Sequence, residues 1–426
     1  MKRTDLLYWI WLSRALQGGK RGLESLLEAY GSPFGIYSAA KIDASRLPDV
    51  SKSVLTVLAK KDLTEACLIL DRCEREGIGI LAYCDEAYPD TLRAILDPPA
   101  VLYYKGHLPD MNQKMCVGTI GTREMSEYGR DAAYKIAYGL ANAGVVIVSG
   151  MAKGIDGVCA AAAIAAGGET VAFLGSGVDV VYPKRHKPLY EEICRHGAVI
   201  SEYPPEEKPL SYHFPIRNRL ISGASQATLV VEARAGSGSL ITAQKAIAQG
   251  RSVYALLTTA TATAAVGAQA LLEEGAKPLI GVGQFLSDFI HIYPKALCLE
   301  NADSEVAVDL PLLSRLGVID AEDAIEKTKA KEEGKAHPHE RKPPSKATAR
   351  ESVRRVSLTE EMLGAMSPAE AAIMRLFFSE EEIPSEQFYS LPYEANEISM
   401  ALTCLEIAGR IKRTAGSLYR LSAERL

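Results

Sequence analysis

Long apolar segments and cysteine motifs are both missing from this sequence of 426 residues. No apolar run reaches the ~18 residues that a membrane-spanning helix needs. No signal peptide is visible, because the short run at residues 8–12 is soon followed by Arg14 and Lys20. The eight cysteines are scattered, without a Cys-x-x-Cys pair or a histidine at ligand spacing. We therefore expect a cytoplasmic protein with reduced thiols, no membrane contact and no metal.

Motifs of catalytic sites are also absent. There is no Gly-x-x-x-x-Gly-Lys-Ser/Thr sequence, and no pair of carboxylates has the spacing of a metal-dependent nuclease. The segment Gly175-Ser176-Gly177 lacks the third glycine of a dinucleotide fingerprint. His186 and His213 have no Ser or Cys nucleophile elbow beside them. We expect a protein that is not an enzyme and needs no cofactor.

The composition is that of a globular protein with two or three domains, 47% hydrophobic and 24% charged. The formal net charge is −5. An anionic partner would therefore be recognised by a local cationic patch and not by the charge of the whole chain.

The centre of the chain, residues 86–300, alternates continuous apolar strands with glycine-rich loops and helices. This pattern is typical of a doubly wound, mostly parallel sheet, and we expect an extended Rossmann-like α/β domain. The expected strands are 101–104, 115–120, 145–149, 170–174, 198–201, 228–231 and 252–256, with a further candidate at 278–280. The expected helices include 129–143, 154–166, 188–195 and 240–249.

Two smaller domains are expected at the flanks. Residues 1–85 look helical, with apolar residues at helical spacing in 5–16, 22–30 and 54–73. Residues 301–360 should form a linker that is basic and disordered from about residue 327, since Lys327–Arg355 holds ten Lys/Arg and four Asp/Glu. This segment is either a solvated spacer or a contact for nucleic acid. Residues 361–426 have the outline of a winged helix, with helices at 368–378 and 397–408 and a wing formed by 410–413 and 418–421.

Glycine-rich loops with cations follow the first strands of the central domain. The candidate anion contacts in them are Gly121, Thr122, Arg123, Ser149, Gly150, Lys153 and Gly154. Glycines allow close approach of the backbone, and the start of the following helix favours an anion. The simpler interpretation of each loop is a tight, capped turn with an exposed cation.

Further candidates lie in later loops. They are Tyr182, Lys184, Arg185, Phe214, Arg217, Asn218, Arg219, Gly238 and Ser239. Because loops at the carboxyl ends of parallel strands share one edge of the sheet, we expect Arg123, Arg217 and Arg219 to meet there. Guanidinium groups beside backbone amides suit phosphate. Solvent-facing charges and a glycine loop chosen for close packing are the simpler interpretations.

Taken together, these motifs resemble the DNA processing protein A family, also called DprA or Smf, from Tyr88 to about Gly275. The motifs that carry the resemblance include Tyr88-Pro89, Asp97-Pro98-Pro99, Gly121-Thr122-Arg123, Ser149-Gly150, Gly154-Ile155-Asp156, Tyr182-Pro183, Ser201-Glu202-Tyr203-Pro204, Phe214-Pro215 with Arg217-Asn218-Arg219, and Val231-Glu232-Ala233. One departure follows Leu256, where Leu257-Thr258-Thr259 and Gly267-Ala268-Gln269 replace the usual Pro-Gly and Gly-x-Asn.

The resemblance implies a non-catalytic mediator of recombination in natural transformation and competence. It implies a homodimer that binds single-stranded DNA and loads the RecA recombinase onto it. By position, Arg123, Lys184, Arg217 and Arg219 would contact phosphates. The N-terminal helices resemble a sterile-alpha-motif (SAM) or degenerate helix–hairpin–helix module, and the C-terminal part resembles the family's winged helix.

Two other functions remain open at this stage. Glu232 with the glycine-rich loop at 236–239 resembles nucleotide-monophosphate phosphoribohydrolases, in which Glu232 would be the catalytic carboxylate. The winged helix could instead make the protein a sequence-specific regulator that binds duplex DNA. For single-stranded DNA, the aromatic side chains of Tyr182, Tyr212 and Phe214 are candidates for base stacking.

Overall fold

The computed structural model describes residues 2–234, 236–257, 266–303 and 305–320. In the C-terminal part it describes 367–377, 382–388, 391–393, 395–408, 410–413 and 418–421. The chain divides into two compact units, residues 1–324 and residues 325–426. The basic segment Lys327–Arg355, predicted to be disordered, lies outside the described residues.

A nine-stranded sheet forms the middle of the first unit, in the order β1-β2-β6-β5-β4-β3-β7-β8-β9. From β6 to β9 in that order, neighbouring strands are parallel, whereas β2 is antiparallel to both β1 and β6. The strands are β1 (Gly79–Ala82), β2 (Val101–Gly106), β3 (Cys116–Ile120), β4 (Val146–Ser149), β5 (Thr170–Phe173), β6 (Gly197–Ser201), β7 (Ala227–Val230), β8 (Ser252–Leu256) and β9 (Lys277–Leu279). The predicted α/β class with a mostly parallel sheet is confirmed, and every strand predicted between residues 115 and 280 is present with each end within one residue.

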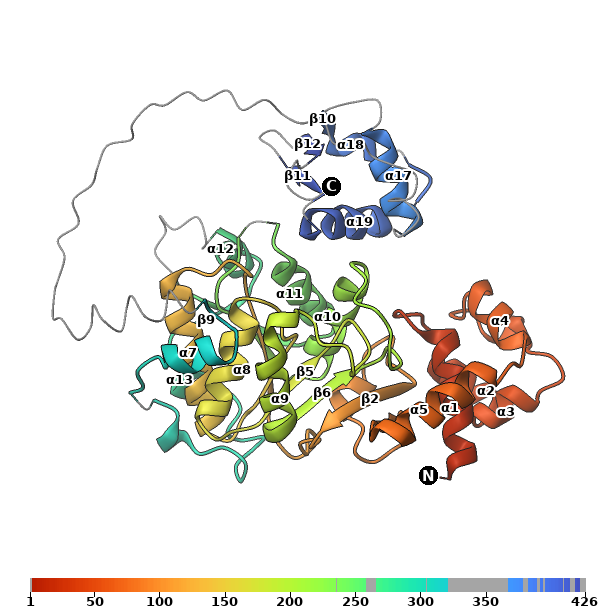
Figure 1. Ribbon diagram of the computed structural model, residues 1–426, viewed down its shortest axis with the longest axis horizontal. Coiled ribbons are helices and arrows are strands. Elements are labelled where there is room, and N and C mark those ends of the chain that lie inside the picture. The colour runs from red at the N-terminus through yellow and green to blue at the C-terminus, as the bar shows by residue number, and fades with distance from the viewer. Residues whose placement is uncertain are drawn as a thin grey trace. The chain divides into compact units, whose positions relative to one another are not determined.

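Helices cover both faces of this sheet (Figure 1). One face carries α7 (Glu127–Asn142), α8 (Ile155–Ala165), α9 (Lys187–His196), α13 (Val282–Ser287) and α14 (Leu310–Arg315). The other carries α6 (Asp90–Arg93), α10 (His213–Gly223), α11 (Gly238–Ala248) and α12 (Val266–Glu273). The four predicted helices correspond to α7, α8, α9 and α11.

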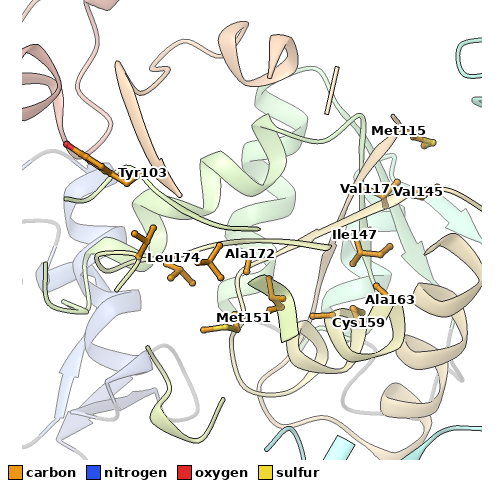
Figure 2. Close-up of a cluster of buried hydrophobic side chains, with 14 of the residues drawn as sticks. Tyr103, Met115, Val117, Val145, Ile147, Met151, Cys159, Ala163, Ala172 and Leu174 are labelled. Carbon is orange, nitrogen blue, oxygen red and sulfur yellow. The ribbon is translucent and has the colours of Figure 1, made fainter. Parts of the chain in front are cut away.

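Each face of the sheet has its own apolar core because successive strand residues point to opposite sides. In β4, Ile147 belongs to one core, whereas Val146 and Val148 belong to the other. Figure 2 shows part of the first core, where Ile147 lies near Cys159 of α8. Strands buried on both faces read as continuous apolar runs, which is why the sequence located them so closely.

The N-terminal helices are α1 (Arg3–Leu16), α2 (Leu23–Tyr30), α3 (Pro33–Ser38), α4 (Lys52–Ala59) and α5 (Thr64–Glu76). The amphipathic run predicted at 54–73 is thus two helices, and Lys61 between them has a φ of +49°. Trp9 shares a core with Tyr103 of β2. The predicted boundary at residue 85 is too late for the sheet, since β1 already belongs to it. The likeness to a SAM or helix–hairpin–helix module stays a prediction.

The predicted start of the linker at residue 301 is wrong. Residues 305–320 include α14, and Leu313, Leu316 and Val318 are buried in the first core. Asp309 caps α14 by accepting a hydrogen bond from the amide of Leu312 at 2.8 Å. The packed part of the first unit therefore continues to residue 320.

The second unit contains α17 (Pro368–Leu376), β10 (Glu382–Pro384), α18 (Ser385–Phe388), α19 (Ala395–Ile407), β11 (Ile411–Arg413) and β12 (Leu418–Leu421). β12 pairs antiparallel with both β10 and β11. A capping box of Ser367 and Glu370 begins α17. The helices and the wing strands predicted from the sequence are present here, and the assignment to the winged-helix class stays a prediction.

None of the helices in the described ranges is both long enough and apolar enough to cross a membrane.

Candidate nucleic-acid interface

The strand order reverses between β3 and β7, and crevices for ligands form beyond the carboxyl ends of strands at such a point. The loop after β3 is packed against the start of α8, where the amide of Ile155 donates to the carbonyl of Thr122 at 3.2 Å. Gly154 precedes α8 with a φ of +85°, and a Cβ there would collide with the backbone of Thr122 and Arg123. The loops after β3 and β4 therefore form one continuous surface, which we call the rim.

Two cations stand free on this surface. The side chains of Arg123 and Lys153 are exposed, and neither makes a hydrogen bond or ion pair with any residue in the described ranges. Both belong to loops that a close backbone contact holds together. They are therefore available to an anion in solution.

The segment around Arg217 was predicted as a loop, and this is wrong. It forms α10, whose first turn holds Pro215. Proline is tolerated there because the first amides of a helix have no partner within the helix. The N-terminal half of α10 nevertheless lies at the rim, because Arg217 donates to the carbonyl of Gly150 at 2.9 Å and to that of Phe173.

Arg217 lies beneath the rim, almost fully buried. A Cβ on Gly150 would lie 2.6 Å from the guanidinium, so a larger residue there would displace this side chain. Burial lowers the pKa of Arg217 to about 10, against the charge of Asp156 that raises it, and the charge of Arg123 lowers it further. Arg217 is thus a cation at neutral pH. Some of its N–H groups already donate to carbonyls at the carboxyl ends of β4 and β5.

Asp156 organises the loop after β4. Its carboxylate accepts hydrogen bonds from the amides of Gly150 at 3.1 Å and Ala152 at 3.4 Å. Burial raises the pKa of Asp156, against the charge of Arg217 that lowers it. The capped turn that was the simpler interpretation of this loop is thus present, and the Asp156 carboxylate fixes the loop that carries Lys153.

Two aromatic rings continue the rim beyond Arg217. The rings of Tyr182 and Phe214 lie 5.3 Å apart at 38°, and the guanidinium of Arg217 is 5.8 Å from the Phe214 ring. Tyr182 is 43% exposed. Tyr212, the third aromatic candidate, contacts the ring of His213. The exposed face of Tyr182 offers a stacking surface for a planar group.

The basic loop after Tyr182 divides into free and engaged cations. Lys184 is exposed, without a partner among the described side chains. Arg185 instead donates to the carbonyl of Gly317 at 2.7 Å and to the carboxylate of Asp320 at 3.0 Å. Lys184 can extend the rim, whereas Arg185 holds the segment after α14.

Arg219 does not point to the rim in this structure. Its buried guanidinium donates to Glu202 at 2.6 Å and lies 3.1 Å from the carboxylate of Asp97. Burial lowers the pKa of Arg219, but the two carboxylates outweigh this and leave it raised. The expected meeting of three arginines is therefore reduced to Arg123 and Arg217. Glu202 and Asp97 were recognised in the sequence only as parts of family motifs, and their role as partners of Arg219 was not predicted.

The remaining candidates have structural partners. Asn218 accepts from Arg217 at 3.3 Å, and Ser149 is buried and accepts from the amide of Met151 at 3.3 Å. Gly238 begins α11, where the hydroxyl oxygens of Ser237 and Ser239 lie 2.7 Å apart. Nothing in these contacts selects the start of α11 as an anion site.

Glu232, the catalytic carboxylate of the rival hypothesis, caps a helix. It accepts from the amide of Ser126 at 3.0 Å and from its hydroxyl at 3.2 Å, directly before α7. The Ser126 hydroxyl in turn accepts from the amide of Gly129 at 2.9 Å. A carboxylate at a helix N-terminus is stabilising by itself. Within the described residues, no group of three His, Cys, Asp or Glu side chains could hold a metal ion.

Comparison with known proteins places this architecture in a family. The family model "DNA recombination-mediator protein A" matches residues 79–290. The DNA processing protein DprA of Bacillus subtilis is 38% identical over 211 residues, which cover 50% of this chain and 71% of the relative. For the DprA of Streptococcus pneumoniae the identity is 42% over 205 residues, or 48% and 72%. The solved structure of the S. pneumoniae protein matches with a TM-score of 0.57 and 32% identity, covering 66% of this chain and 97% of that one.

The chain therefore belongs to the DNA processing protein A family, DprA or Smf. The resemblance noted from the sequence motifs is confirmed.

Proposed function

We propose that this protein binds single-stranded DNA along the rim and acts as a non-catalytic recombination mediator in natural transformation. The observation that carries the proposal is one surface on which three exposed cations, without partners among the described residues, lie around a buried arginine and an exposed ring. Arg123 and Lys153 stand at one end, Arg217 lies in the floor, and Tyr182 and Lys184 stand at the other end. Free cations suit a phosphate chain, since each phosphate contact releases counterions.

Single-stranded DNA fits this surface better than a duplex does. An exposed ring can stack on an unpaired base of any sequence, and the faces of bases inside a duplex are covered by their neighbours. The pair of Tyr182 and Phe214 supplies such a ring next to the cations. We therefore expect binding that depends strongly on salt and weakly on sequence.

Catalysis is not favoured by the position of Glu232. The carboxylate of Glu232 is buried and accepts hydrogen bonds from the amide and the hydroxyl of Ser126, so it is engaged in capping α7. We expect no release of base from nucleoside monophosphates. Release that Glu232→Gln abolishes would establish the phosphoribohydrolase alternative.

The central test is a titration of labelled oligothymidine followed by fluorescence polarisation at several salt concentrations. Arg123→Ala, Lys153→Ala and Lys184→Ala should each weaken binding. Lys295→Ala is the matched control: Lys295 is exposed, and the amide of nearby Cys298 donates to the carbonyl of Ala143 at 3.0 Å, before β4 and so at the opposite edge of the sheet. Equal affinities for all four variants and the wild type would refute the rim as the DNA site.

We further propose that the protein acts in the cytoplasm as a homodimer and loads the RecA recombinase onto the bound strand. Family membership supports this mediator role. Sedimentation velocity tests the dimer. The time course of RecA filament formation on single-stranded DNA, with and without the protein, tests the loading; an unchanged rate would refute it.

A further inference from the structure

A cavity of about 420 Å³ lies in the first unit and shares no residue with the rim. Tyr8 and Trp9 of α1, Phe34 of α3 and Tyr83 after β1 form its aromatic walls. The rings of Tyr8 and Phe34 lie 5.1 Å apart at 64°. Phe34, the second residue of α3, lines this cavity and is 54% exposed. An exposed aromatic ring at the mouth of an aromatic hollow marks a place where a partner group can be buried.

Two carboxylates and one guanidinium lie at this cavity, so negative charge exceeds positive charge there. Asp5 lines it and makes no ion pair with a side chain that the structure describes. Glu24 stands beside it and accepts a hydrogen bond from the Tyr83 hydroxyl at 3.0 Å. Arg93 also lines the cavity, but its guanidinium lies over the Tyr83 ring at 5.0 Å and donates to the carbonyls of Tyr83 and Asp85. The charge left open to a ligand is therefore the carboxylate of Asp5.

We propose that this cavity binds an arginine or lysine side chain of a partner protein. Aromatic faces attract a cation. The apolar stem of a long basic side chain can lie along the walls while its head reaches a carboxylate. Asp5 at the wall and the rings of Tyr8 and Phe34 supply these two features together.

Nucleic acid fits this cavity less well. Its phosphates would approach Asp5 and Glu24, and the donors of Arg93 are engaged by backbone carbonyls. A basic segment of a protein has the complementary charge. The expected partner is therefore a protein segment that inserts one arginine or lysine side chain into the cavity and has apolar residues beside it.

The test uses the intrinsic fluorescence of the protein. The chain has two tryptophans, Trp9 in the cavity wall and Trp11 two residues later. The full-length protein is titrated with the peptide acetyl-Gly-Leu-Arg-Leu-Gly-amide and with its citrulline analogue, which has nearly the same shape but no charge. We expect a saturable change of tryptophan emission with the arginine peptide and binding at least ~5-fold weaker with the citrulline peptide.

Variants locate the effect. Asp5→Asn should weaken binding of the arginine peptide by ~3-fold or more, and Phe34→Ala by ~5-fold or more. The matched controls are Asp49→Asn, in the turn before α4, and Leu68→Ala, on α5, which change exposed residues outside the cavity wall. Melting temperatures like that of the wild type show that the variants are folded.

Three results would overturn this inference: no saturable change with the arginine peptide, equal binding of the citrulline peptide, or displacement of the peptide by an oligothymidine that itself requires Phe34. The inference is separate from the proposed DNA binding. Phe34→Ala should leave the affinity for oligothymidine at the rim unchanged, so either proposal can fail alone.

Discussion

Arg123→Ala is the sharpest perturbation of the proposed DNA site. The side chain is exposed and has no partner among the described residues. Its removal should change the free energy of unfolding by less than ~0.5 kcal/mol, as for most surface substitutions. Any change in DNA affinity can then be assigned to the contact with DNA and not to loss of the fold.

The salt dependence gives the magnitude. Each phosphate that a single strand presents to a bound cation contributes ~0.7 to the slope of log K against log salt. If Arg123 neutralises one phosphate, the variant should have a slope shallower by that amount. Over a fourfold rise in salt, from ~50 to ~200 mM, the ratio of wild-type to variant affinity should therefore fall ~2.6-fold.

Fluorescence polarisation with oligothymidine and with mixed-sequence oligonucleotides measures both quantities. The loss should be the same for every sequence, because a phosphate contact carries no base information. Lys295→Ala should keep the wild-type slope. An unchanged slope and affinity in Arg123→Ala, with the fold intact, would remove this residue from the site.

Three further results are expected. Arg219→Ala should lower the free energy of unfolding by ~3 kcal/mol or more, because it leaves the carboxylate of Glu202 buried without its partner. The folded variant should still bind oligothymidine with the wild-type affinity. A loss of affinity at an unchanged melting temperature would instead place Arg219 in the DNA site. Tyr182→Ala should weaken binding by ~1–3 kcal/mol with an unchanged salt slope, as removal of a stacking ring does. Phe34→Ala, which removes an exposed ring of α3 outside the rim, should not weaken it, and equal losses in both would refute the stacking role. Burial lowers the pKa of His213 to about 4. The stability that the neutral ring contributes is therefore complete above the unfolded pKa of 6.5 and is lost as the pH falls toward 4. Melting curves between these pH values should show a loss of about 3 kcal/mol that His213→Gln reduces, and an equal loss in that variant would contradict the assignment.

The wrong prediction at α10 concerns a helix that the sequence pattern did not reveal. The segment from Phe214 to Arg219 was predicted as a loop, but it is helical, and Pro215 in the first turn of the helix removes no internal hydrogen bond. The helix also separates the two arginines that the loop interpretation placed together. Two residues that are two positions apart in a helix are separated by about 200° of rotation about its axis, so their side chains point to nearly opposite sides. Arg217 therefore faces the strand ends, while Arg219 faces Glu202 and Asp97.

The sequence was sufficient to identify eight strands of the large sheet, the helices α7, α8, α9 and α11, and the family. Strands buried on both faces must be apolar along their whole length, and the motifs stand at the turns between them, so local residues carry this information. It also determined that Arg123 and Lys153 belong to glycine-rich turns. Which cations remain free could be seen only in the folded chain. A guanidinium becomes a buried ion-pair partner or an open phosphate contact according to the carboxylates that distant segments bring beside it, as Glu202 and Asp97 do for Arg219.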